Sequence, residues 1–329
     1  MSNEDNYLIS FGPESAAILS EEIKEKLAKK NLSASLVTAL NEGCHAKWLA
    51  DTFVLRDLVP EAMDNAATRG SMFHKVMEIL FALPQEERTH QATRDAVDEV
   101  LNDDEFIDAV NEESIAWLRN AVNSYYSMGG KPEKVEIAHV KTGRKTKDGE
   151  EELKIGLEVF VKGKIGNTKR DILGFVDQVL QDPRPNRENC IVVSDWKSGA
   201  KFKEWNPKTK SLDGLPEARQ QLIYTMLLEN VGNKVSAAKL VYPVAKHIVN
   251  VNVNDENLRQ RVIEDVEKAD ETLNELIESN EFSYNPTALC SWCPLVKICP
   301  KPFKLNKEKF IEAREKQHEP EALRVGIAF

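Results

Sequence analysis

The sequence IVVSDWKSG, residues 191–199, indicates a strand that ends in a polar site. Ile191 to Ser194 form a short run rich in β-branched residues, which is typical of a strand buried in a sheet. An acid, an aromatic residue and a base follow with no turn signal before them. Asp195 and Lys197 are two residues apart, so on a strand their side chains point to the same face. The strand is therefore predicted to end with an acid and a lysine side by side.

A second acid, Asp177, lies in GFVDQV, on a predicted strand that a Pro-rich turn separates from the first. We expect the two strands to be neighbours, which brings Asp177 close to Asp195. Two adjacent carboxylates repel each other unless a cation neutralises them, and Mg²⁺ prefers oxygen ligands. A bound metal activates water and stabilises charge on a phosphoryl oxygen. The pattern predicts a hydrolytic metal site with Lys197 beside the water; the alternative is a surface salt bridge.

The remaining periodicity predicts an α/β fold, with helices first, then a mixed central sheet flanked by helices, then helices again. Helices are expected at 14–30, 35–55 with an interruption at Gly43, 67–83, within 91–128, at 216–232 and at 256–281; strands are expected at 153–163, 170–182, 190–196, 237–244 and 247–253. We expect a single domain, 1–329. It comprises an N-terminal helical part (1–130), a catalytic α/β core (131–255) and a C-terminal helix, cysteine cluster and tail (256–329).

Composition predicts a cytoplasmic protein without a membrane span. The 329 residues are 41% hydrophobic, yet no stretch approaches the roughly 20 apolar residues of a membrane helix. The N-terminus has no basic start followed by an apolar core, as a secretion signal would. The net charge of −10 argues mildly against nucleic acid as a partner. Basic residues are nevertheless concentrated in KTGRKTK (141–147) and KFKEWNPKTK (201–210).

Four short motifs occur in an order that resembles the RecB-like branch of the PD-(D/E)XK nuclease superfamily. That family carries G-x-x-x-H on a helix, then G-x-x-D, then D-x-K, then Q-x-x-x-Y on a helix. The matching residues here are Gly70 and His74, Gly174 and Asp177, Asp195 and Lys197, and Gln220 and Tyr224. The resemblance spans roughly residues 33–300 and implies a restriction-endonuclease-like α/β fold. It also implies that the protein is located in the cytosol of a bacterium, an archaeon or a phage-infected host.

The resemblance also implies roles. His74, Asp177 and Asp195 would bind Mg²⁺ or Mn²⁺ together with the backbone carbonyl of Trp196. Lys197 would position or deprotonate the attacking water. Gln220 and Tyr224, at i and i+4 on one helix face, would contact DNA or support the lysine. The alternative for His74 is a histidine that is hydrogen-bonded in the core or at the surface without a metal. The alternative for Gln220 and Tyr224 is an ordinary helix flank without a functional role. Glu78 is a weaker candidate for the site, and Glu158 is interpreted as a strand residue only.

CSWCPLVKIC gives Cys290, Cys293 and Cys299, and three thiolates in a reducing compartment indicate a metal site rather than disulfides. The region around Cys44 resembles the start of the iron–sulfur RecB-like nucleases, which include the AddB nuclease domain and the CRISPR-associated RecB-like exonucleases. This resemblance implies that Cys44 completes a [4Fe–4S] site, with Zn²⁺ as the alternative metal. His45, beside Cys44, is a weaker candidate for the same ligand position. Cys190 is interpreted as a small buried hydrophobe.

The segment 200–215 carries Lys201, Lys203 and Trp205, a basic and aromatic mixture that suits single-stranded DNA or, equally, a solvated loop. The predicted function is a metal-dependent DNA exonuclease acting on single strands or duplex ends in recombination, repair or CRISPR-type processing. The alternative is a non-catalytic DNA-end-binding adaptor with a structural four-cysteine metal site. A separate helicase, recombinase or CRISPR adaptation protein is left open as a partner, as is oligomer formation.

Overall fold

Strand β7, Cys190–Trp196, is the central strand of a five-stranded sheet with the order β5-β6-β7-β8-β9. The other strands are β5 Leu157–Gly163, β6 Ile172–Gln181, β8 Lys234–Tyr242 and β9 His247–Val251. β7 pairs antiparallel with β6 and parallel with β8, so the sheet is mixed, as predicted. The pairing also confirms that the strands of Asp177 and Asp195 are neighbours.

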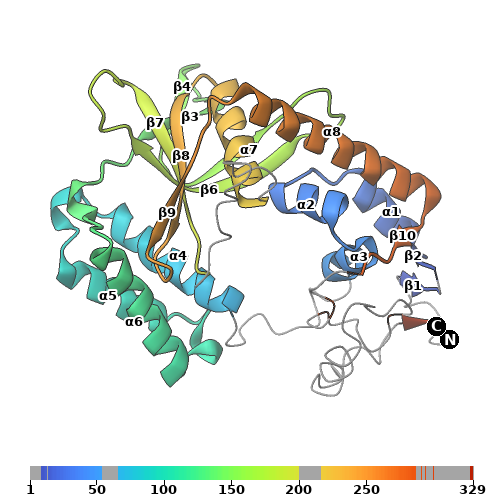
Figure 1. The fold of residues 1–329 in the computed structure, drawn as a ribbon, viewed down its shortest axis with the longest axis horizontal. Coiled ribbons are helices and arrows are strands. Elements are labelled where there is room, and N and C mark those ends of the chain that lie inside the picture. The colour runs from blue at the N-terminus through green and yellow to red at the C-terminus, as the bar shows by residue number, and fades with distance from the viewer. Residues whose placement is uncertain are drawn as a thin grey trace, which may run out of the picture. The chain divides into compact units, whose positions relative to one another are not determined.

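Helix α7, Pro216–Asn230, lies in the chain between the parallel strands β7 and β8. Parallel neighbours cannot be joined by a tight turn and need a crossover, usually through a helix. The helix packs on β5, β7 and β8 (Figure 1). Its Leu222, Ile223 and Leu228 are completely buried. The helix thereby holds Gln220 and Tyr224 at a defined height above the sheet.

Three helices form the other large part of this unit: α4 Ala66–Ala82, α5 His90–Leu101 and α6 Glu112–Ser127. Asn111 caps α6 reciprocally with Ser114, which satisfies backbone N–H groups that lack partners at a helix start. Trp196, 5% exposed, joins β7 to this helical core. Its ring meets Phe73, Phe81 and Tyr125 at centroid distances of 5.8, 6.3 and 5.5 Å.

The strand predicted at 153–163 is two strands, because the chain turns at Gly156. β3 His139–Lys145 and β4 Glu151–Ile155 form a hairpin, and β5 begins at Leu157. A Cβ atom at Gly156 would lie 2.4 Å from the carbonyl oxygen of Val179. Only glycine allows the two backbones to approach this closely.

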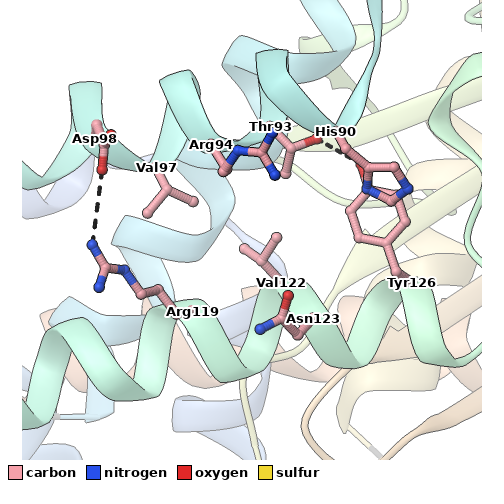
Figure 2. A pocket seen from close by; sticks show the side chains of 9 residues that line it. All are labelled: His90, Thr93, Arg94, Val97, Asp98, Arg119, Val122, Asn123 and Tyr126. Atoms are coloured by element: carbon pink, nitrogen blue, oxygen red, sulfur yellow. Dashed lines mark hydrogen bonds and ion pairs between the residues drawn. The ribbon is translucent and has the colours of Figure 1, made fainter.

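A groove with a volume of about 360 Å³ lies between α5 and α6 (Figure 2). Its polar groups pair with one another: Thr93 hydrogen-bonds Tyr126, and Arg119 lies 4.0 Å from Asp98. The His90 ring lies 4.5 Å from that of Tyr126. These internal pairs account for much of the polarity of the groove.

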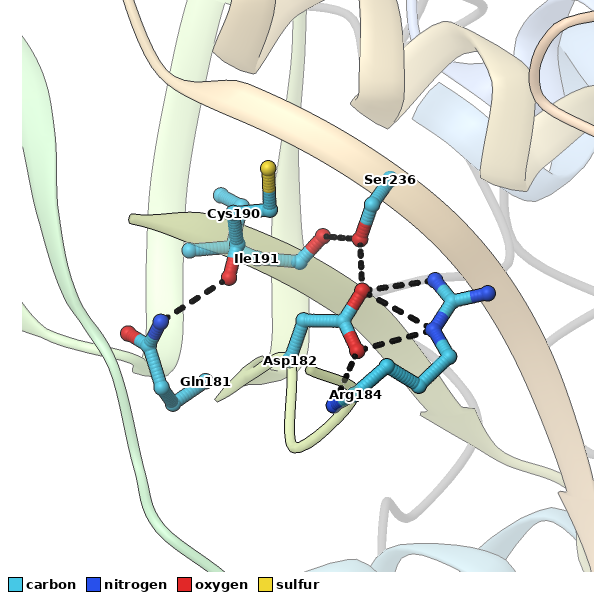
Figure 3. A network of polar contacts seen from close by, with 6 residues as sticks. All are labelled: Gln181, Asp182, Arg184, Cys190, Ile191 and Ser236. Atoms are coloured by element: carbon cyan, nitrogen blue, oxygen red, sulfur yellow. Dashed lines mark hydrogen bonds and ion pairs between the residues drawn. The ribbon is translucent and has the colours of Figure 1, made fainter. Parts of the chain in front are cut away.

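A second polar network joins the turn between β6 and β7 to Gln181 on β6 and Ser236 on β8 (Figure 3). The carboxylate of Asp182 accepts hydrogen bonds from Arg184 and from Ser236, the latter at 2.5 Å. Arg184 and Ser236 hold the pKa of Asp182 well below its usual range, against the effect of burial. Cys190 is half-buried rather than buried, and its carbonyl accepts from Gln181.

The chain divides into two compact units, and the elements above belong to the unit made of residues 61–165 and 171–263. The other unit comprises 1–60, 166–170 and 264–329. The structure describes residues 9–12, 14–53, 66–199, 216–286, 290, 293, 299 and 327–328. Whether these units act as the single nuclease domain expected above stays a prediction. None of the helices in the described ranges is both long and apolar enough to cross a membrane.

The first two strands and the last two among the described residues form a small sheet in this other unit, with the order β10-β2-β1-β11. The strands are β1 Ile9–Phe11, β2 Ser15–Ile18, β10 Phe282–Ser283 and β11 Ile327–Ala328; the helices are α1 Glu21–Ala28, α2 Ala34–Glu42, α3 His45–Phe53 and the later part of α8, Glu256–Ser279. The helix predicted over 14–30 was therefore wrong in its first half. Pairing of β2 with β1 and β10 decides this segment, since tertiary context overrides weak local propensity.

Candidate metal centre

His74, Asp177 and Trp196 form a closed set of contacts between α4, β6 and β7. The Nε2 atom of His74 lies 2.9 Å from the carbonyl oxygen of Trp196, and its Nδ1 atom lies 3.4 Å from Oδ2 of Asp177. The backbone N–H of Trp196 donates to the same Oδ2 at 2.8 Å. The backbone of Trp196 is therefore held on both sides, while its ring is anchored in the core.

Glu158 joins this set, although the sequence indicated a strand residue only. One ligand atom each of His74, Glu158 and Asp177 lies within 4.8 Å of the others. Glu158 has φ +45°, a left-handed conformation that costs a non-glycine residue about 1–2 kcal/mol. Such strain is concentrated at functional sites. The available sequence signal was an acid between apolar strand residues, Leu157 and Val159.

The electrostatics of the site favour a bound cation. Burial, followed by the nearby Asp195 carboxylate, raises the pKa of Asp177 well above its usual value. Burial also raises the pKa of Glu158, with repulsion from Glu78 and Asp195 next in size. Burial lowers the pKa of His74, which keeps the imidazole neutral and able to act as a ligand. Crowded carboxylates of this kind repel each other until a positive charge arrives.

Lys197 lies at the start of a hydrogen-bonded chain that runs onto α7. Its Nζ atom lies 2.7 Å from Oδ2 of Asp195 and donates to Oε1 of Gln220 at 2.9 Å. Gln220 in turn donates from Nε2 to the hydroxyl of Tyr224 at 3.0 Å. Burial raises the pKa of Tyr224 to about 12, so the phenol stays neutral. The structure thus brings the predicted lysine and its two predicted supports into one network.

Both motif glycines have a steric reason. A Cβ atom at Gly174 would lie 2.5 Å from Cε1 of Tyr224, and one at Gly70 would lie 2.8 Å from Oγ of Ser198. Contacts this short force the neighbouring group to move. Gly174 therefore leaves room for the phenol that supports Gln220, and Gly70 lets α4 approach Ser198, just after the end of β7.

The metal-centre residues border a cavity of about 510 Å³. His74, Glu158 and Lys197 line it, together with Glu78, which forms a 3.0 Å ion pair with Lys75. Glu78 is thus at the cavity but is paired with a lysine. Among the described residues the donors fit a divalent cation, because carboxylate oxygens with an imidazole suit Mg²⁺ or Mn²⁺ better than a soft metal.

The four predicted cluster cysteines all belong to the other unit. Cys44 lies between α2 and α3, where Gly43 approaches Ala39 so closely that a Cβ atom would be 2.5 Å from its carbonyl oxygen. Cys293 donates its N–H to the carbonyl of Cys290 at 3.1 Å, which forms a tight turn. Cys44, Cys290, Cys293 and Cys299 are each half-buried, and none of the chain's five cysteines, all within the described residues, forms a disulfide.

Tyr284 links the two ends of the cysteine set. Burial, followed by the nearby thiols of Cys299 and Cys44, raises the pKa of its phenol to about 12. Cys44, which precedes the five-stranded sheet in the chain, and Cys299, which follows it, therefore lie near one side chain. His45 is engaged at both ring nitrogens, by Leu40 O at 2.8 Å and by Ser283 Oγ at 3.0 Å, which disfavours it as a competing ligand.

The basic segment 200–215, with Lys201, Lys203 and Trp205, lies outside the described residues. A different feature borders the site on the described part of the sheet. Phe160 and Phe175 are paired across β5 and β6 with ring centroids 5.3 Å apart. Phe175 is 54% exposed, and the Arg144 guanidinium lies 5.9 Å from the Phe160 ring centre. Neither Phe160 nor Phe175 is one of the motif residues named above, so the sequence did not predict this pair.

A family model described as "PD-(D/E)XK nuclease superfamily" matches residues 31–300. The chain belongs to the PD-(D/E)XK nuclease superfamily. The match covers both β6 and β7, with their acids, and the helices that carry His74 and Gln220. Membership confirms the predicted α/β fold with its central sheet flanked by helices. The RecB-like subtype and the iron–sulfur cluster remain predictions.

Two crystal structures are similar at low identity. One, described as "Putative exonuclease" from Eubacterium rectale, is 13% identical, with a TM-score of 0.45 over 88% of this chain and 97% of that one. The other, of the protein SSO0001, is 14% identical, with a TM-score of 0.28 over 68% and 84%. Scores this low carry no information about activity. No curated protein matches the chain.

Proposed function

We propose that this PD-(D/E)XK superfamily member is a DNA exonuclease that depends on Mg²⁺ or Mn²⁺. The observation that supports this most directly is the convergence of His74, Glu158 and Asp177, whose ligand atoms lie within 4.8 Å of each other. Asp195 and Lys197 stand at the end of the neighbouring strand. A non-catalytic scaffold has no need for a cluster of carboxylates that repel each other, from the buried Asp195 to the exposed Glu158.

His74, Glu158, Asp177 and Asp195 would hold the metal, with the carbonyl of Trp196 as a further ligand. When bound, the metal would activate water and stabilise negative charge on a phosphoryl oxygen. The chain itself supplies position. Lys197 offers its ammonium group to the attacking water or to the phosphate oxygen, because Asp195 and Gln220 hold the amine on either side. A donor fixed in advance stabilises developing charge without reorganisation.

The aromatic pair of the exposed Phe175 and the half-buried Phe160 favours DNA with unpaired bases as the substrate. Phe175 lies two residues before Asp177, and Phe160 lies two residues after Glu158. Bases stack on exposed aromatic rings whatever their identity, and cations nearby attract the backbone. Arg144 supplies such a cation beside Phe160. Single strands and frayed duplex ends therefore fit this surface better than intact duplex, which presents no unstacked base.

Cleavage of end-labelled DNA tests the proposal. Wild-type protein with Mn²⁺ or Mg²⁺ should degrade single strands and duplex ends. Lys197→Ala should lose this activity, whereas Lys234→Ala, at an exposed position on β8, should keep it. A covalently closed circular single strand separates an exonuclease, which needs an end, from an endonuclease. Equal cleavage by wild type and Lys197→Ala would place the active site elsewhere.

A DNA-end-binding adaptor is the second candidate function. It shares the fold and the aromatic pair but needs no metal chemistry. Metal-loaded wild type that binds DNA ends and cleaves none would favour it. Membership in a nuclease superfamily and the intact Asp177, Asp195 and Lys197 favour the enzyme instead.

For the second unit we propose a [4Fe–4S] cluster held by Cys44, Cys290, Cys293 and Cys299. The shared neighbourhood of Cys44, Cys299 and Tyr284 supports it, because four thiolates from distant segments can staple a fold together. Zinc is the alternative for a four-thiolate site. Iron and sulfide analysis of anaerobically purified protein, beside zinc analysis of the same sample, distinguishes the two.

A further inference from the structure

Three polar side chains lie in a row across the central sheet. Gln178 on β6 is paired with Ser194 on β7, and Ser194 is paired with Lys239 on β8. Residues directly opposite each other on adjacent strands project their side chains to the same face. The three polar groups therefore stand next to one another on one face of the sheet.

The members of this row have no partners within the described residues. Gln178 is 2% exposed and Ser194 is completely buried, yet Nε2 of the amide and Oγ of the serine make no hydrogen bond. Burial alone lowers the pKa of the Lys239 ammonium, with no carboxylate of the described residues acting on it. Buried polar groups nearly always have partners. Two lacking one, beside a half-buried lysine that no described carboxylate pairs, indicate that a ligand or ordered water satisfies them.

A cavity of about 250 Å³ is lined by two members of the row, Gln178 and Lys239. Lys131 and Lys134, from the turn after α6, also line it. The described residues around it include no Asp or Glu, although acids outnumber bases in the chain by 54 to 44. The α5–α6 groove differs, because there the polar groups pair with one another (Figure 2). The charged residues that line the cavity are thus all lysines, while Glu133, outside the lining, is near enough to Tyr125 to raise the pKa of its phenol further, after burial and Tyr126.

We propose that this cavity binds a phosphate monoester. Lys239 and Gln178 would donate to the phosphate from the floor, and Lys131 and Lys134 would balance its second charge at the rim. Charged donors placed around one point suit a phosphate better than a single carboxylate. The choice of phosphate rests on the proposed function, because phosphodiester hydrolysis leaves a phosphate monoester at a strand end or on a released nucleotide.

The cavity also has apolar walls, to which Tyr125, Val241 and Ile248 contribute. They would pack against the sugar attached to the phosphate, so we expect a nucleotide to bind more tightly than inorganic phosphate. Trp196 lines both this cavity and the one at the metal centre. A phosphate here would therefore contact the side chain whose backbone contacts His74 and Asp177.

Thermal unfolding and titration calorimetry in EDTA test this site without any cleavage. The ligands are inorganic phosphate, dAMP, deoxyadenosine and a 5′-phosphorylated oligonucleotide. Phosphate and dAMP should raise the Tm of wild type, as any ligand specific for the folded state does, and deoxyadenosine should not. Comparing dAMP with the oligonucleotide distinguishes a released nucleotide from a strand end as the source of the phosphate.

Lys239→Met has an expected signature that surface effects do not share. Without ligand its Tm should exceed that of wild type, because a half-buried charge with no described carboxylate beside it is removed. Its affinity for dAMP should fall about 10-fold or more, since a charged hydrogen bond is lost. Lys234→Met, an identical change at an exposed position of the same strand, should alter neither quantity. The rim variant Lys131→Met/Lys134→Met should weaken dAMP binding without raising the Tm.

Three results would overturn the proposal. If no phosphate compound binds wild type, the row is satisfied by water alone. If deoxyadenosine binds as well as dAMP, the cavity recognises apolar groups and not phosphate. If Lys234→Met loses as much affinity as Lys239→Met, the effect is that of surface charge. Since binding is measured without metal, phosphate binding by a protein that cleaves no DNA would leave this site standing and refute only the nuclease.

Discussion

Replacing Gly174 by alanine tests whether Tyr224 positions Lys197 through Gln220. A Cβ atom there would lie 2.5 Å from Cε1 of Tyr224 and 2.9 Å from its hydroxyl oxygen. Non-bonded carbon atoms prefer about 3.5–4.0 Å, so the ring has to retreat by roughly 1 Å. That movement draws the phenol away from Nε2 of Gln220, which now lies 3.0 Å from it. Gln220 then loses the contact that orients its Oε1 atom toward Lys197.

We expect overpacking to cost about 1–3 kcal/mol and the lost hydrogen bond about 1 kcal/mol. Urea denaturation measures the sum as a lower midpoint at an unchanged slope. The cleavage rate should fall as well, by up to about 100-fold, because small displacements of a positioned group are costly in catalysis. Stability and rate are to be measured on the same preparation, at a temperature where the variant is fully folded.

Two controls make the result decisive. Gly163→Ala, on β5, brings a Cβ atom only to 3.2 Å from Cδ2 of Leu227, the far end of a flexible side chain, so its cost should stay within about 0.5 kcal/mol. In a Tyr224→Ala background the ring that the new Cβ atom would clash with is absent. Gly174→Ala should therefore lower the free energy of unfolding much less there than in wild type. An equal cost in both backgrounds would refute the reasoning, because the strain would then lie elsewhere.

Three further predictions follow from particular contacts. Glu158→Gln should weaken Mn²⁺ binding in calorimetry about 10-fold or more, whereas Glu150→Gln, in the exposed β3–β4 turn, should not; equal affinities would remove Glu158 from the metal centre. Asp182→Asn should lower the free energy of unfolding at pH 7 by about 1–2 kcal/mol, discounted because the Arg184 side chain is 52% exposed. The folded-state pKa of Asp182 is depressed, so its contribution is present above the unfolded value of about 4 and is lost as the pH falls further; a deficit that persists undiminished at pH 2 would contradict this. Cys44→Ala and Cys293→Ala should lose iron while Cys190→Ala keeps it, and iron retained in Cys44→Ala would exclude that ligand.

Much of the candidate site could be predicted from sequence because its residues occur in short motifs on regular elements. Asp195 and Lys197 follow an apolar strand, and Gln220 and Tyr224 share a helix face, so local periodicity places each pair. Glu158 could not be found this way. Its participation depends on a left-handed backbone conformation and on the pairing of β5 with β6, and neither is written in a local pattern.

The first strands show the same limit in the fold. Residues 15–18 have no strong strand signal, and they form β2 because β1 and the distant β10 pair with them. The row of Gln178, Ser194 and Lys239 likewise depends on the registers of three strands. In the sequence these residues are an amide, a hydroxyl and a lysine far apart, with nothing to associate them.

By itself the sequence determined the class of fold, the order of the main strands and helices, and the identity of the acids and the lysine at the strand ends. These follow from the period of apolar residues and from glycines and prolines at the boundaries, which act over a few residues. Only the tertiary structure decided which side chains share a site, at which glycines a Cβ atom would clash with a neighbouring ring, and which polar groups are left without partners. Those properties depend on register and on packing between distant segments, which become defined only when the sheet assembles.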